Sequence, residues 1–278
     1  MMVKILAIGD FHGKFPKKLQ KFMNEVDLVI SVGDYPSWSF RKEFFKYCYG
    51  TDRDLSEFID VEKLEAGLLK DLKSADDVLR ILNSSGKPVL TTIGNYDFHN
   101  VNDSFDVPIL ANDEDLFSKA IASFPKIKRI DYKAIKFRDI VLIGGYGSML
   151  PGIPESKNFK SHFKILQKLF RQFSRENKKR KVLFVTHNMP YNCKLDKIRD
   201  EEAPKESFGQ HYGSKLIRKV IEKYQPVLLI GGHFHENQGK TRIGKTTVVN
   251  VGEAGKGECA VIDFDEKMGK IKSLKFVK

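Results

Sequence analysis

Five segments share one pattern: an apolar, β-branched run of strand length stops abruptly at polar residues able to bind a metal. The runs do not alternate between apolar and polar residues, which is typical of strands covered on both faces. The segments are VKILAIGDFH (3–12), DLVISVGD (27–34), VLTTIGNYD (89–97), KVLFVTHNMP (181–190) and PVLLIGGHFH (226–235). They predict an α/β fold with buried strands.

Helical spacing of apolar residues fills the intervals between these runs. The helical patterns cover residues 55–72, 116–122, 159–173 and 216–224. An alternation of strand and helix indicates right-handed crossovers and mostly parallel pairing. In such a sheet the ligand crevice lies outside the carboxyl ends of the strands, so we expect the five polar clusters to converge there.

Further strands are predicted beyond the five runs, at 129–137, 140–144, 246–251, 259–264 and 270–277. Turn-like segments join the last three, which favours hairpins in a second, partly antiparallel sheet. No internal repeat or linker interrupts the chain, so we expect a single domain over residues 1–278. The long connections 35–54 and 145–180 are candidate cap segments.

Composition excludes several classes of protein. With 41% hydrophobic and 30% charged residues, the chain is typical of globular proteins and not of disordered, fibrous or membrane proteins. No apolar run approaches the roughly 20 residues of a membrane span. The three cysteines are few and far apart, which argues against a disulfide framework or a thiolate zinc site and favours a cytoplasmic location. The net charge of +12 favours an anionic partner such as a phosphate ester, a nucleotide or nucleic acid.

The polar residues at the strand ends are candidate metal ligands. A lone histidine there is more often structural, but four of the chain's seven histidines lie at these ends. The D-x-H and H-x-H pairs place two side chains on one side of an extended backbone. Oxygen and nitrogen ligands without a thiolate suit a pair of divalent ions such as manganese, iron or zinc. The candidates are Asp10, His12, Asp34, Asn95, His187, His233 and His235.

These motifs resemble the calcineurin-like metallophosphoesterases, whose pattern runs D-x-H, G-D, G-N-H-[DE], H and G-H-x-H. The corresponding segments here are GDFH (9–12), GD (33–34), GNYD (94–97), TH (186–187) and GHFH (232–235), in the same order. The resemblance covers about residues 3–265. It implies two mixed β-sheets packed as a sandwich and flanked by helices.

The resemblance also implies a role for each candidate ligand. Asp10, His12 and His235 would hold one ion. Asn95, His187 and His233 would hold a second, and Asp34 would bridge the two. A pair of divalent ions holds phosphate oxygens and lowers the pKa of water.

This sequence departs from the family pattern at two positions. Tyr96 replaces the histidine of G-N-H-[DE], whose usual work is to stabilise the transition state or to protonate the leaving oxygen. A phenol, with a pKa near 10, is a poor proton shuttle. His99 could take over that role, but we favour the explanation that His99 only packs or caps the loop, because nothing fixes its direction. Ser37 stands where the family's G-D-x-x-D has a second aspartate.

Two other segments invite functional interpretations. GKTRIGKT (239–246) matches the Walker A pattern, but a strand pattern follows it where a P-loop needs a helix, so we predict a hairpin and no ATP site there. The segment 35–50 interleaves aromatic and basic residues and could stack a base and meet phosphate. A helix that buries Phe40, Phe44 and Tyr47 on one face explains the same spacing, and we favour that helix.

We therefore expect a cytoplasmic, dinuclear metal-dependent hydrolase of phosphoesters, with phosphodiesters or nucleotides favoured as substrates and no membrane partner. Asp34, Asn95, Tyr96 and His99 are the candidate catalytic residues. One alternative is a nuclease, which the net charge suggests, although the basic residues are dispersed. The other is a noncatalytic binding scaffold on the same fold, against which the presence of all seven candidate ligands argues.

Overall fold

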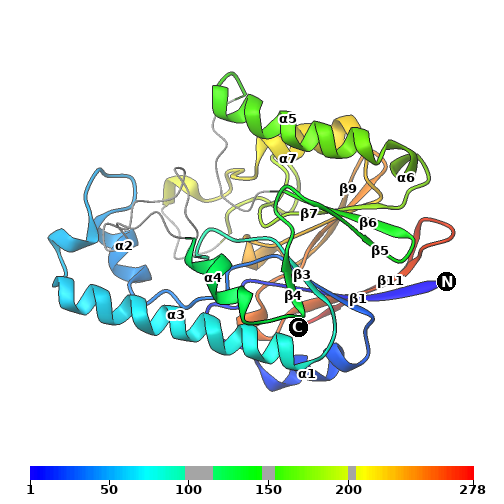
Figure 1. Ribbon diagram of the computed structural model, residues 1–278. Coiled ribbons are helices and arrows are strands. Elements are labelled where there is room, and N and C mark those ends of the chain that lie inside the picture. Colours follow the sequence, from blue (N-terminus) through cyan, green and yellow to red (C-terminus); the bar gives the residue numbers. More distant parts are fainter. Residues whose placement is uncertain (98–114, 146–153, 200–204) are drawn as a thin grey trace.

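Two mixed β-sheets pack face to face with helices outside them (Figure 1). The computed structural model describes residues 1–97, 115–145, 154–199 and 205–278, and within these residues each sheet has six strands. The first sheet has the order β12 (Lys270–Val277), β11 (Cys259–Asp265), β1 (Met2–Ile8), β2 (Leu28–Ser31), β3 (Val89–Thr91) and β4 (Ile127–Arg129). The second has the order β5 (Ala134–Phe137), β6 (Ile140–Gly144), β7 (Val182–Val185), β8 (Leu228–Gly231), β10 (Thr246–Asn250) and β9 (Gly239–Ile243).

In the first sheet the neighbouring strands β1, β2, β3 and β4 are parallel, and in the second sheet the neighbouring strands β6, β7, β8 and β10 are parallel. Antiparallel strands complete both sheets: β11 and β12 beside β1, and β5 and β9 at the edges of the second sheet. The carboxyl ends of the predicted strands therefore point the same way within each sheet, as the sequence patterns require.

The strand sequences are apolar without interruption because other parts of the protein cover both faces of each sheet. In β1, Ile5 and Ala7 pack between the two sheets. Leu6 and Ile8, on the opposite face, pack outward in a cluster that includes residues of α1 (Lys17–Asn24). Burying such a side chain stabilises the fold by about 1.5–3 kcal/mol relative to exposing it.

Helices cover the outer face of each sheet, so the molecule has four layers (Figure 1). On the first sheet, α1, α3 (Val61–Ser84) and α4 (Leu116–Ala122) contribute Leu19, Leu79 and Phe117 to the outer cluster. On the second sheet, α5 (Lys157–Gln172) and α7 (Lys215–Tyr224) contribute Phe170 and Ile221. The remaining helical elements of the described residues are α2 (Arg41–Tyr47), α6 (Ser174–Lys178) and the 3-10 turns η1 (Leu55–Glu57), η3 (Lys205–Ser207), η4 (His235–Asn237) and η5 (Ala254–Lys256). The predicted sandwich flanked by helices is confirmed.

Two details of the predicted strands are wrong. The chain turns between β4 and β5, where Tyr132 has a left-handed backbone (φ 51°), so residues 129–137 contribute to both sheets instead of forming one strand. The three closing strands are also divided. β10 belongs to the second sheet, whereas β11 and β12 form a hairpin that pairs with β1 in the first.

The two candidate cap segments differ in what the structure describes. Residues 35–54 include α2, which carries no fully buried residue, so the prediction of a helix is confirmed but that of one buried aromatic face is wrong. In 145–180, α5 packs on the second sheet, and residues 146–153 lie outside the described residues. A cap function stays a prediction for both. Among the described residues, no helix has the length and apolar character needed to cross a membrane.

Candidate metal centre

The candidate ligands gather where the parallel strands of both sheets end. Asp10, Asp34, Asn95, His187 and His233 each follow the last residue of a strand by no more than four positions. Hydrogen bonds tie these strand ends together across the sheets. The His187 Nδ1 donates to the Val32 carbonyl at 2.8 Å, which also fixes Nε2 as the atom that faces the site.

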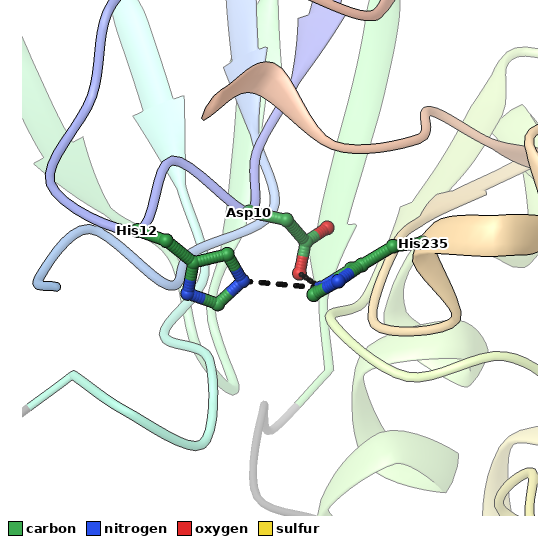
Figure 2. A group of neighbouring side chains, drawn as sticks. All are labelled: Asp10, His12 and His235. Carbon is green, nitrogen blue, oxygen red and sulfur yellow. Dashed lines mark hydrogen bonds and ion pairs between the residues drawn. The ribbon is translucent and has the colours of Figure 1, made fainter. Parts of the chain in front are cut away.

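One group of ligand atoms comprises Asp10, His12 and His235 (Figure 2). Their donor atoms lie within 4.8 Å of one another, with His12 Nε2 3.1 Å from His235 Nε2 and His235 Nε2 3.2 Å from Asp10 Oδ1. Asp10 is fully buried, whereas the His235 side chain keeps 30% of its surface exposed. On its far side, His235 Nδ1 lies 3.5 Å from the Glu253 carboxylate, which can orient the ring.

A second group surrounds the buried His187. The His187 Nε2 lies 2.8 Å from Asn95 Oδ1, 3.2 Å from His233 Nδ1 and 3.4 Å from Asp34 Oδ2. The donor atoms of Asp10, Asp34 and His187 also lie within 4.8 Å of one another. Asp34 is therefore close to a ligand atom of each group. The structure thus brings all seven predicted ligands together at one site.

The backbone is held in an uncommon conformation at four of these residues. Asp10, His12, Asp34 and His233 have φ values of 55°, 46°, 58° and 71°. Such left-handed residues cost on the order of 1–3 kcal/mol each and cluster at functional sites, where the surrounding structure enforces them.

Steric contacts explain why glycine occupies two positions of the motifs. A Cβ atom at Gly94 would lie 1.9 Å from Asp34 Oδ1, and one at Gly232 would lie 2.1 Å from Asp10 Oδ2. Only glycine lets the backbone approach these carboxylates so closely.

Burial and neighbouring charges separate the histidines into two kinds. Burial, with help from the charge on His235, lowers the pKa of His12 to about 3. Burial and His187 hold the pKa of His233 well below its usual range. Burial also opposes the charged form of His235, but the Asp10 carboxylate outweighs it and raises the pKa of His235 to about 9. Against the same effect of burial, Asp34 and Asp10 raise the pKa of His187.

The donor set fits divalent ions. In each group two imidazole nitrogens lie at hydrogen-bond distance from each other, and each group also contains carboxylate oxygens. Nitrogen and oxygen donors without a thiolate suit manganese, iron or zinc. A cation between the paired nitrogens would satisfy lone pairs that otherwise compete for one proton.

Asp97 supports the loops that carry Asp34 and Asn95, and the sequence interpretation assigned it no role. Its buried carboxylate accepts backbone hydrogen bonds from Asp34 at 2.9 Å, Tyr35 at 2.8 Å and Gly94 at 2.7 Å. It therefore fixes the loop that carries Asp34 against the loop that carries Asn95. The fourth position of the G-N-H-[DE] motif was a signal for this residue. Glu253 was signalled too, because it follows the strand β10 at the same edge.

The structure describes both residues that depart from the family motif, Tyr96 and Ser37. The Tyr96 backbone N–H donates to Asp34 Oδ1 at 2.9 Å, and its ring centroid lies 5.9 Å from that of His12. Burial and the Asp34 charge raise the pKa of Tyr96, so its phenol stays protonated. Ser37, at the second departure, donates from its Oγ to Asp71 of α3 at 2.5 Å. His99 lies outside the described residues.

The Walker-like segment is a hairpin, as predicted. Thr246 of β10 pairs with Ile243 of β9, and Gly244 adopts a positive φ of 55° in the turn. No helix follows the turn, so its backbone cannot form a P-loop.

The chain is similar in sequence to known proteins. The sequence model of the family described as calcineurin-like phosphoesterase matches residues 3–237. An uncharacterized protein of Methanocaldococcus jannaschii, MJ1162, is 25% identical over 254 residues, which are 89% of this chain and 87% of that protein. The UPF0046 protein K07C11.7 of Caenorhabditis elegans is 32% identical over 75 residues, 27% of this chain and 22% of its own.

Solved structures share the fold. One crystal structure aligns over all of this chain and 99% of its own, with a TM-score of 0.66 and 21% identity. The protein TT1561 of Thermus thermophilus aligns over the same shares, with a TM-score of 0.56 and 16% identity.

The fold and the candidate ligands define a protein of the metallophosphoesterase class, whose members typically bind divalent metals and hydrolyse phosphoesters. The family match covers most of the chain, and the chain belongs to the calcineurin-like phosphoesterase family.

Proposed function

We propose that this chain is a cytoplasmic, dinuclear metal-dependent phosphoesterase that prefers phosphodiesters or nucleotides to simple alkyl monoesters. When bound, the two ions supply positive charge for the phosphate oxygens and a water of lowered pKa. The two groups of ligand atoms that meet at Asp10 and Asp34 support this proposal.

In this proposal the ligands keep the roles that the motifs imply. Asp10, His12 and His235 hold one ion, and Asn95, His187 and His233 hold the other. Asp34 is the bridging ligand, because its carboxylate lies close both to Asp10 and to His187 Nε2.

The preference for diesters rests on Tyr96. Its phenol, with a raised pKa, can donate a hydrogen bond but holds its proton too tightly to release it readily to a leaving alkoxide. Substrates whose leaving oxygen is already stable need that proton least. A diester also carries one less negative charge into the site than a monoester does.

Metal analysis of the purified protein, followed by a panel of mono- and diesters, tests the proposal. We expect about two divalent ions per chain and faster turnover of diesters. Tyr96→His should raise monoesterase activity relative to diesterase activity, and His99→Ala should matter only if His99 supplies the acid. A wild-type enzyme that hydrolyses alkyl monoesters faster than diesters, with a ratio that Tyr96→His does not change, would contradict the preference.

A further inference from the structure

A row of aromatic rings leads from the metal centre to α2. The Tyr96 ring lies beside the ligand His12, and its centroid is 4.3 Å from that of Trp38. The Trp38 ring continues to Phe44 at 5.2 Å and to Phe45 at 5.6 Å, and Phe45 lies 5.2 Å from Tyr49. We call these five residues, Trp38, Phe44, Phe45, Tyr49 and Tyr96, the aromatic row.

The hydrophobic core does not account for this row. None of its members belongs to the three apolar clusters found among the described residues, and none is fully buried. By contrast, Phe11 and Tyr35, a few residues away in sequence, are fully buried in the core and stacked with centroids 5.1 Å apart. Partly buried rings gathered beside a candidate metal site are typical of a surface that binds a flat ligand.

The loop that carries Trp38 is fixed by α3. Asp71 is 5% exposed and accepts hydrogen bonds from Ser37 Oγ at 2.5 Å, Ser39 N at 3.0 Å and Ser39 Oγ at 2.7 Å. Ser74 Oγ accepts from Ser37 N at 2.8 Å. Trp38 therefore stands between two serines that are both tied to one buried carboxylate. A ring held in this way loses little conformational entropy when a ligand stacks on it.

A positive charge accompanies the row. The Arg41 guanidinium carbon lies 5.1 Å from the Phe45 ring centroid. Its charge also reaches the metal centre, because it adds a small effect to the burial that lowers the pKa of His12 and opposes the rise that burial causes in the pKa of Tyr96. Figure 1 shows α2, which carries Arg41, beside the N-terminal half of α3.

We propose that the aromatic row binds the base of a nucleotide by stacking while Arg41 faces its phosphate side, so that the ester at the metal centre is a nucleotide ester. This inference rests on the proposed phosphoesterase function and names its substrate class. Base stacking on aromatic side chains, combined with a cation near phosphate, is the physical basis of such binding. Because every base has a flat face, stacking alone does not select among bases.

Trp38 is the chain's only tryptophan, so its fluorescence reports on the row directly. We expect AMP to quench this fluorescence in the metal-loaded protein. Ribose 5-phosphate, which lacks a base, should displace AMP only at roughly five- to a hundredfold higher concentration. No quenching, or equal competition by ribose 5-phosphate, would overturn the inference. Phenyl phosphate that competes as well as AMP would also overturn it, since the row would then take any aromatic ester.

Two leucine variants of α2 form a matched pair for calorimetric titration with AMP. Phe45→Leu removes a ring of the row and should weaken AMP binding about tenfold, with ribose 5-phosphate binding unchanged. Tyr47→Leu removes a ring from the same helix that stacks instead on Phe58, with centroids 4.6 Å apart, and should leave AMP binding as it is. Equal effects of the two variants would overturn the inference.

Failure of this inference is distinguishable from failure of the proposed function. Quenching by AMP requires binding but no hydrolysis, so a protein that binds AMP and hydrolyses no ester contradicts only the proposed activity. A protein that hydrolyses diesters but shows no preference for AMP over ribose 5-phosphate contradicts only the aromatic row.

Discussion

Metal binding at the group of Asp10, His12 and His235 should release a proton, and the proton should come from His235. In the metal-free protein the Asp10 carboxylate raises the pKa of His235 to about 9, so at pH 7 this imidazole is almost fully protonated. A histidine must lose its extra proton and be neutral before it can bind a metal. His12, with a pKa lowered to about 3, is already neutral and has no proton to release.

The size of the effect follows from the same pKa. At pH 7, about two units below that pKa, removing the proton costs about 2.7 kcal/mol. The apparent affinity of this group should therefore rise up to about tenfold per pH unit between pH 6 and pH 8. Since the His235 side chain is 30% exposed, solvent screens part of the pairing with Asp10, and tenfold is an upper value.

Calorimetric titration of the metal-free protein with zinc, in two buffers of different ionisation enthalpy at pH 7, counts the released protons. His235→Gln and His12→Gln each remove one ligand of the same ion, so they form a matched pair. We expect about one proton fewer from His235→Gln than from His12→Gln, while any proton from His187 is common to both. Equal proton counts in the two variants would refute the assignment.

Three further changes test other parts of the site. Asp34→Asn should weaken both ions and abolish metal-dependent hydrolysis, whereas a fully active variant with two tightly bound ions would contradict the bridging role. Lys245→Ala, in the hairpin turn, should leave the activity unchanged, and the variant should bind ATP no differently from other nucleotides. A selective loss of ATP affinity would show that the turn binds phosphate. Asp97→Ala leaves three buried N–H donors without their partner, so the free energy of unfolding in urea should fall by about 3 kcal/mol or more, and a change below about 1 kcal/mol would contradict the supporting role.

The sequence was sufficient to predict the strands that carry the site and their convergence. Runs such as 3–12 and 226–235 are apolar on both faces, and polar residues mark the end of each strand, so local pattern and topology point to the same edge. The turn at residues 130–133 was not predictable in this way. Apolar residues on both sides of Tyr132 make the segment look like one strand, and the left-handed backbone of Tyr132 has no signal in the residue type.

Contacts between residues far apart in the sequence could not be predicted from local sequence patterns either. Ser37 and Asp71 are 34 residues apart, and Asp71 lies in the middle of α3, where an acidic residue usually faces solvent. Only the packing of α3 against the loop after β2 makes Asp71 a buried acceptor. Similarly, Glu253 reaches His235 because β10 lies beside β8, a pairing of strands that are not consecutive in sequence.

The two departures from the family motif, at Ser37 and at Tyr96, belong to one region of the structure. Ser37 precedes Trp38 and is held by Asp71, and the Trp38 ring packs against Tyr96. Considered as motif positions, they are two separate losses, one of a supporting carboxylate and one of an imidazole. In the structure Asp71 of α3 holds the loop of Ser37, and this loop places the Trp38 ring against Tyr96, the residue that replaces the imidazole. Both departures therefore lie on the same side of the metal centre, and we expect the substrate choice of this chain to depend on that side.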